Sequence, residues 1–227
     1  MEKRNDIRRY IWTVVNIFAI LMLGLLLQTG GAYLVNAAVK LLSEGTSSGA
    51  AAASQYSDYM TSIRALEPRQ TAHAIFVAPL VEELVFRLIF LRAGRMVLPF
   101  WAANLIQAVL FAVYHTVTIQ KVYGFVMGLI IGGVFYYCPV IYKAVHKAED
   151  TGDTDGSSGL ISLPNSLMGV AITFILHMII NATGIYVAPL FPADIPIAAQ
   201  ILIGCSAMII SAGAVVVLFL QTRRKSS

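Results

Sequence analysis

Ionisable and amide side chains interrupt three apolar stretches of the chain at spacings typical of a helix face. Three short motifs hold them: Glu82-Glu83-x-x-x-Arg87, Phe111-x-x-x-His115 and His177-x-x-x-Asn181. A charged side chain at the centre of a membrane costs roughly 2.5–3.5 kcal/mol on insertion scales. Because such residues recur in three separate stretches, the sequence predicts one polar site where three helices meet.

The first motif combines two carboxylates with one guanidinium group. Residues four apart face the same side of a helix, so Glu83 and Arg87 are predicted to form an ion pair. Glu82 is rotated by about 100° from Glu83 on an α-helix, and no cation on its own helix faces it. This leaves Glu82 available as a general acid or base.

The other two motifs supply imidazole and amide groups. His115 follows Phe111 by one turn, and an isolated intramembrane histidine is often only a hydrogen-bond partner between helices. His177 and Asn181 are also four apart and could donate two hydrogen bonds towards one point, as an oxyanion hole requires. Each group has an ordinary explanation by itself, whereas the whole set indicates catalysis.

The composition shows which elements must position these residues. The chain has 227 residues, of which 58% are hydrophobic and 12% charged, against about 45–50% and 25% in average soluble chains. Its mean hydropathy is +0.75. We therefore predict an all-α, polytopic membrane bundle of about six transmembrane helices. These cover Tyr10–Val35, Ala72–Leu91, Met96–Val117, Val122–Tyr142, Leu163–Thr183 and Ile197–Leu220.

The basic residues predict the orientation in the membrane. With a cytoplasmic N-terminus, 11 Lys and Arg residues fall in cytoplasmic segments and 4 in outer segments, which predicts that both termini are cytoplasmic. The net charge of +4 does not indicate nucleic-acid binding, because these residues lie at helix ends. Cys138 and Cys205 lie in apolar runs and indicate no disulfide framework.

The polar core is predicted over residues 72–184, preceded by a first span and outer loop (1–71) and followed by a last span and basic tail (185–227). Within the outer loop, Ser43–Gln55 is predicted to be flexible and Tyr56–Pro68 to form a short interfacial helix. The acidic segment Glu149–Gly159 is predicted to be a solvated, disordered loop. It is not a calcium loop, because Thr151 and Ser162 would occupy two key ligand positions.

A stripe of small residues, Gly124-x-x-x-Gly128-x-x-x-Gly132, lies along the fourth predicted span. Such stripes let two helix backbones approach closely in lipid. Two alternatives are open: packing within the chain, or a homo-oligomer built on this glycine face.

The three polar motifs resemble those of the CPBP (CAAX protease and bacteriocin-processing, or Abi) family, which contains the type II CAAX prenyl endopeptidases. They match in identity, spacing and order, over about residues 78–184. The resemblance implies an intramembrane endopeptidase in which Glu82 activates water with help from His115. It also implies that His177 and Asn181 stabilise the oxyanion. The remaining motif positions, Glu83, Arg87 and Phe111, would support the site.

The resemblance leaves the role of a metal open. Glu82, His115 and His177 could supply three ligands to Zn²⁺, but the first motif is not His-Glu-x-x-His, so one helix offers no pair of zinc ligands. We favour a mechanism without a cofactor.

Short loops and few spans indicate a bacterial cell membrane protein. They favour a leader peptide, bacteriocin precursor or signalling peptide as substrate over a prenylated CAAX protein. The alternatives are a non-catalytic bacteriocin-immunity or peptide-binding protein and a small proton-linked transporter. The last is disfavoured because the chain lacks inverted repeats and paired broken helices.

Overall fold

The computed structural model describes residues 2–146, 163–190 and 195–224, with side chains over 14–137, 163–190 and 195–214. Within these residues the chain forms helices and connecting segments and no strand, which confirms the predicted all-α fold. The elements are α1 (Glu2–Gly45), α2 (Ser47–Arg64), α3 (Pro68–Ala72), η1 (His73–Val77), α4 (Ala78–Glu82), η2 (Glu83–Leu91), α5 (Arg92–Gly94), α6 (Phe100–Tyr114), α7 (Thr118–His146), α8 (Leu163–Ala182), η3 (Thr183–Val187), η4 (Ala188–Leu190) and α9 (Ile197–Arg224). The acidic segment Glu149–Gly159 lies outside the described residues.

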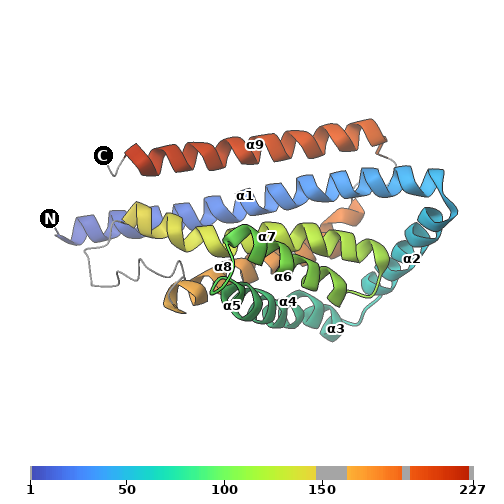
Figure 1. Cartoon of the computed structure of the whole chain (residues 1–227), viewed down its shortest axis with the longest axis horizontal. Coiled ribbons are helices and arrows are strands. Elements are labelled where there is room, and N and C mark those ends of the chain that lie inside the picture. Colours follow the sequence, from blue (N-terminus) through green and yellow to red (C-terminus); the bar gives the residue numbers. More distant parts are fainter. Residues whose placement is uncertain (1, 147–162, 191–194, 225–227) are drawn as a thin grey trace.

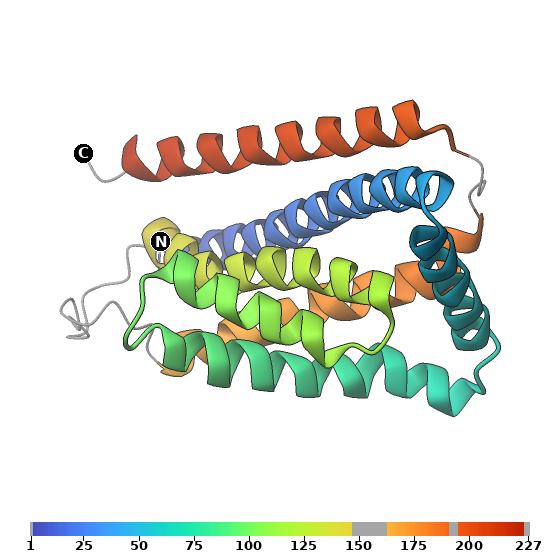
Figure 2. The same ribbon diagram turned by 45° about the vertical axis from the view of Figure 1, so that its right-hand side comes forward.

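The long helices run roughly along one axis, and α2 lies across one end of the bundle (Figure 1). Helix α1 packs against α9 on one side and against α7 and α8 on the other. Helix α1 begins and α9 ends at the end of the bundle opposite α2 (Figure 2). The ends of α6 and α8 that carry the polar motifs therefore lie towards α2.

In the part of the chain that the structure describes, four helices are long and apolar enough to cross a membrane, within Val14–Gly45, Thr118–Tyr137, Leu163–Leu190 and Ile197–Ala214. Large apolar side chains such as Phe18, Leu202 and Ile209 point out of the bundle and are exposed, as a lipid-facing surface requires. The predicted span Met96–Val117 is shorter than expected. Its helix, α6, has 15 residues, because Pro99 and His115 at its two ends have extended backbone dihedral angles.

The predicted span Ala72–Leu91 falls within one continuous helical run, residues 68–94, that alternates between α and π geometry. In η1 the Ala78 N–H donates to the His73 carbonyl, five residues earlier. Proline cannot donate to the preceding turn and its ring crowds the carbonyl four residues before it. The π turn η1 ends just before Pro79, and its five-residue hydrogen bond lets the helix continue past the proline. The π turn η3 stands in the same relation to Pro189.

Helix α2 begins earlier than predicted. The expected loop Ser43–Gln55 is mostly helical, and the helix ends at Arg64 rather than continuing to Pro68. Thr46 caps the helix, since its Oγ1 accepts a hydrogen bond from the Gly49 N–H at 3.0 Å. The four alanines of residues 50–53 then favour helix over loop.

The glycine stripe packs against α6 of the same chain. A Cβ on Gly128 would lie 3.0 Å from Ala108 Cα, and one on Gly132 would lie 2.0 Å from Asn104 Oδ1. The close approach allows Asn104 Nδ2 to donate to the Leu129 carbonyl at 3.0 Å and Gln107 Nε2 to the Gly128 carbonyl at 2.8 Å. Of the two alternatives, packing within the chain is correct, and this face is not free to bind a second copy.

This packing predicts opposite effects for two adjacent glycines. Gly132→Ala should lower the thermal stability of the detergent-solubilised protein, because overpacking an interior typically costs about 1–3 kcal/mol. Gly133→Ala is the matched control, since its Cβ would meet nothing within 4 Å, and it should leave stability equal or slightly higher. Equal melting temperatures for Gly132→Ala and wild type would contradict this account of the α6–α7 contact.

Candidate active site

Two carboxylates from the 68–94 helical run converge on one imidazole from α8. His177 Nδ1 lies 2.8 Å from Glu83 Oε1, and His177 Nε2 lies 3.5 Å from Glu82 Oε2. The Glu83 side chain is fully buried, whereas Glu82 keeps 12% of its side-chain surface exposed. Glu82 is therefore the carboxylate that a substrate could reach.

Glu83 also pairs with Arg87, as the spacing predicts. Arg87 Nε lies 3.2 Å from Glu83 Oε2, and both side chains have no exposed surface. The contact is an ion pair by distance rather than an aligned hydrogen bond. The guanidinium also lies over the Phe111 ring, 4.7 Å from its centroid, a favourable cation–π placement.

The predicted pairing of Glu83 with Arg87 is thus one part of a larger network. Its second oxygen holds His177, so Arg87, Glu83, His177 and Glu82 form one connected chain of charged and polar groups. The spacing within one helix cannot reveal this link, because His177 is 94 residues away in sequence. Only the packing of η2 against α8 creates it.

These contacts determine which nitrogens of His177 can act. Glu83 is a carboxylate that accepts a hydrogen bond, so Nδ1 carries a hydrogen and the Nε2 edge faces Glu82. Nε2 can donate only if the ring is an imidazolium. In that state the two carboxylates, the guanidinium and the imidazolium sum to zero charge, which limits the electrostatic cost of burying them together.

His115 lies at the end of α6, one turn after Phe111. Its Nδ1 lies 2.8 Å from the Phe111 carbonyl, so Nδ1 carries the hydrogen and Nε2 is left with a free lone pair. A Cβ on Gly124 of α7 would lie 3.1 Å from His115 Nδ1. The first glycine of the stripe therefore makes room for this histidine, a role that its spacing alone did not indicate.

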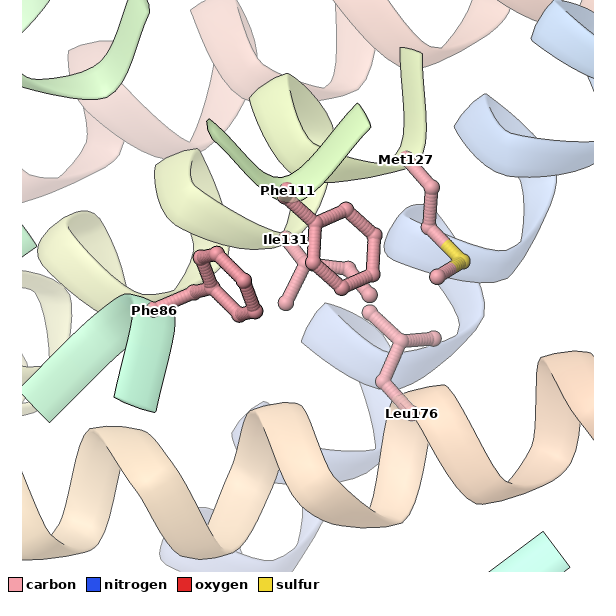
Figure 3. Close-up of a cluster of buried hydrophobic side chains, with 5 residues drawn as sticks. All are labelled: Phe86, Phe111, Met127, Ile131 and Leu176. Carbon is pink, nitrogen blue, oxygen red and sulfur yellow. The ribbon is translucent and has the colours of Figure 1, made fainter. Parts of the chain in front are cut away.

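The Phe111 ring separates the two histidines. Its centroid lies 4.9 Å from that of His115 and 6.0 Å from that of His177, each in a T-shaped arrangement. Figure 3 shows Phe111 among buried apolar side chains, close to Phe86 and to Leu176 of α8. The ring therefore forms an apolar floor and fixes the spacing of the two imidazoles.

Asn181 is tied to a backbone group rather than to the carboxylates. Its Nδ2 donates to the Ala74 carbonyl in η1 at 3.0 Å. An amide nitrogen has two hydrogens, so one orients the side chain and the other can still serve a substrate. A carbonyl partner has no signature in the sequence, and this contact could not have been predicted from it.

The described residues do not form a metal centre of the kind considered above. They contain no group of three or more His, Cys, Asp or Glu side chains placed to hold a metal ion. The trio Glu82, His115 and His177 is not such a group in this arrangement.

Residues 66–145 match a family model described as Type II CAAX prenyl endopeptidase Rce1-like. The matched segment is similar to that family. It contains the first two polar motifs but ends before His177 and Asn181, and the match supports a CAAX-type intramembrane protease in general, consistent with the CPBP resemblance. No curated protein and no solved structure matched the chain.

The connected chain of charges predicts different roles for neighbouring carboxylates. Glu83→Gln should destabilise the protein by about 3–5 kcal/mol, because it leaves the Arg87 charge buried without a partner. Adding Arg87→Met should restore much of that stability, because no buried charge is then left unpaired. Glu82→Gln is the matched control and should change stability little.

Thermal or denaturant unfolding in detergent would measure these differences. A single Glu83→Gln variant as stable as wild type would contradict the central role of the Glu83 carboxylate.

Proposed function

We propose that the chain is an intramembrane endopeptidase in which Glu82 is the general base. The observation that carries the proposal is the placement of the partly exposed Glu82 carboxylate 3.5 Å from His177 Nε2, next to the fully buried ion pair of Glu83 and Arg87. Charged groups inside membrane helices commonly mark functional sites. The Rce1-like match of residues 66–145 supports the same reaction class.

Glu82 would accept a proton from water as the water oxygen attacks the scissile carbonyl carbon. It would then return that proton to the leaving amine as the C–N bond breaks. His115, with a free lone pair on Nε2, would hold the second water hydrogen. The Phe111 ring would exclude bulk water from the side of the attacking water opposite Glu82 and His115. Few groups would then orient that water.

His177 and Asn181 would stabilise the negative oxygen of the tetrahedral intermediate. His177 can do so as an imidazolium, oriented by Glu83, and Asn181 through the amide hydrogen that Ala74 does not use. Donors held in place before the reaction need no reorganisation when charge develops. Glu83, Arg87 and Ala74 thus act indirectly, by orienting the two donors.

The substrate would be a peptide or a membrane-associated protein that enters between the helices. The excess of Lys and Arg in the predicted inner segments supports cytoplasmic termini, and the short loops favour a bacterial cell membrane. The end of the bundle with α2 would then face outwards, and so would the polar site. This position favours a leader, bacteriocin-precursor or signalling peptide over a substrate presented from the cytosol.

Replacing the base should stop cleavage without unfolding the protein. Glu82→Gln should lower the rate by at least about 100-fold, because it removes the general base. The membrane peptidome of a deletion strain complemented with wild-type or Glu82→Gln protein would show whether processed peptides are lost. Glu44→Gln, which changes an exposed carboxylate on α1, is the control. Unchanged processing with Glu82→Gln would refute the assignment of the base, whereas a phenotype that survives without cleavage would favour peptide binding or immunity.

We also expect the reaction to need no metal. Cleavage should survive 1,10-phenanthroline and extensive dialysis, and purified protein should contain no stoichiometric zinc by mass spectrometry. The reason is that the described residues hold no group of three or more His, Cys, Asp or Glu side chains placed to hold a metal ion. Loss of activity in chelator that is reversed by added zinc would contradict this mechanism.

A further inference from the structure

Helix α2 holds a tyrosine hydroxyl at the same end of the bundle as the polar site. Gln120 Nε2 of α7 donates to the Tyr59 Oη at 3.0 Å. Tyr56, one turn earlier on α2, stacks on Tyr59 and on Tyr123 of α7, with centroids 6.5 Å and 5.5 Å apart. These contacts fix the α2 aromatic rings against the start of α7.

The face of α7 that holds Tyr59 also contacts the site. Gln120 and Gly124 are four apart and therefore lie on one side of α7, and Gly124 is the residue on which His115 packs. The pKa of Tyr59 is raised first by burial and also by the negative charge of Glu82, while the hydrogen bond from Gln120 lowers it. The negative charge of the carboxylate that we assign as the base therefore acts on the Tyr59 hydroxyl.

The hydrogen bond from Gln120 leaves the Tyr59 hydroxyl free to act as a donor. A phenol can both accept and donate, and here the oxygen accepts from Gln120. Among the described residues no acceptor takes the hydroxyl hydrogen in return. Tyr56 differs, because its pKa is raised by burial and by Tyr59, without a contribution from Glu82.

We propose that Tyr59 is a substrate-positioning residue whose hydroxyl donates a hydrogen bond to a backbone carbonyl of the bound peptide, next to the scissile bond. This inference rests on the proposed peptidase function. This hydroxyl lies at the end of the bundle from which a peptide would reach Glu82, and a carbonyl oxygen is the acceptor that every peptide supplies. Gln120 restricts the hydroxyl before the peptide binds, which reduces the entropy lost on binding.

The kinetic test compares Tyr59, whose hydroxyl accepts a hydrogen bond from Gln120, with Tyr56, which stacks on Tyr123. With a fluorogenic bacteriocin leader peptide, Tyr59→Phe should raise KM about fivefold with kcat nearly unchanged, as expected for the loss of one neutral hydrogen bond made equally in the ground and transition states. Gln120→Leu should act in the same direction but less strongly. Tyr56→Phe should leave both constants unchanged, and an unchanged KM for Tyr59→Phe would overturn the proposal.

A binding measurement separates this proposal from the peptidase function. Fluorescence anisotropy would give the affinity of the same peptide for Glu82→Gln protein and for the Glu82→Gln, Tyr59→Phe double variant. A Kd about fivefold weaker in the double variant supports the role of Tyr59 even if wild type cleaves nothing, in which case only the peptidase function fails. Equal affinities, or no binding to either protein, overturn the proposal.

Discussion

The Glu83 carboxylate has no exposed surface, and its two oxygens are shared between Arg87 on its own helix and His177 on α8. A buried charge is tolerated only when it is paired, so this carboxylate determines how η2 and α8 must pack. It also orients the imidazole that faces Glu82. The same contact therefore neutralises a buried arginine, fixes two helices against each other and places the Nε2 edge of His177 in the site.

The rest of the bundle makes this contact geometrically feasible. Glu83 begins the π segment η2 and Glu82 ends α4, so the change of helix type falls between the two carboxylates. Irregular helical turns of this kind are frequent at functional sites. On the opposite side, small residues of α7 bring α6 close enough for His115 and Phe111 to reach the same region. Without these irregularities, straight helices would hold the polar groups farther apart.

The site has a partly exposed side and an apolar, buried side. Phe111, Phe86 and Leu176 form an apolar cluster behind the histidines, whereas Glu82 keeps some exposure and faces the end of the bundle that α2 covers. An apolar surrounding strengthens every electrostatic interaction inside it. It also requires that each buried polar group has a partner, which is why Glu83 and the Ala74 carbonyl matter as much as the residues that would touch a substrate.

Sequence alone determined the fold class, the approximate places of the helices and the identity of the polar residues, because apolar periodicity and the cost of burying charge are properties of local sequence. It also predicted the pairing of Glu83 with Arg87, which are one turn apart. It did not predict the early start of α2 at Ser47, where a threonine cap and the four alanines that follow favour helix. Only the tertiary structure joined Glu83 to His177, tied Asn181 to Ala74 and placed the glycine stripe against α6. Those contacts join residues that are distant in sequence, and they depend on how whole helices pack.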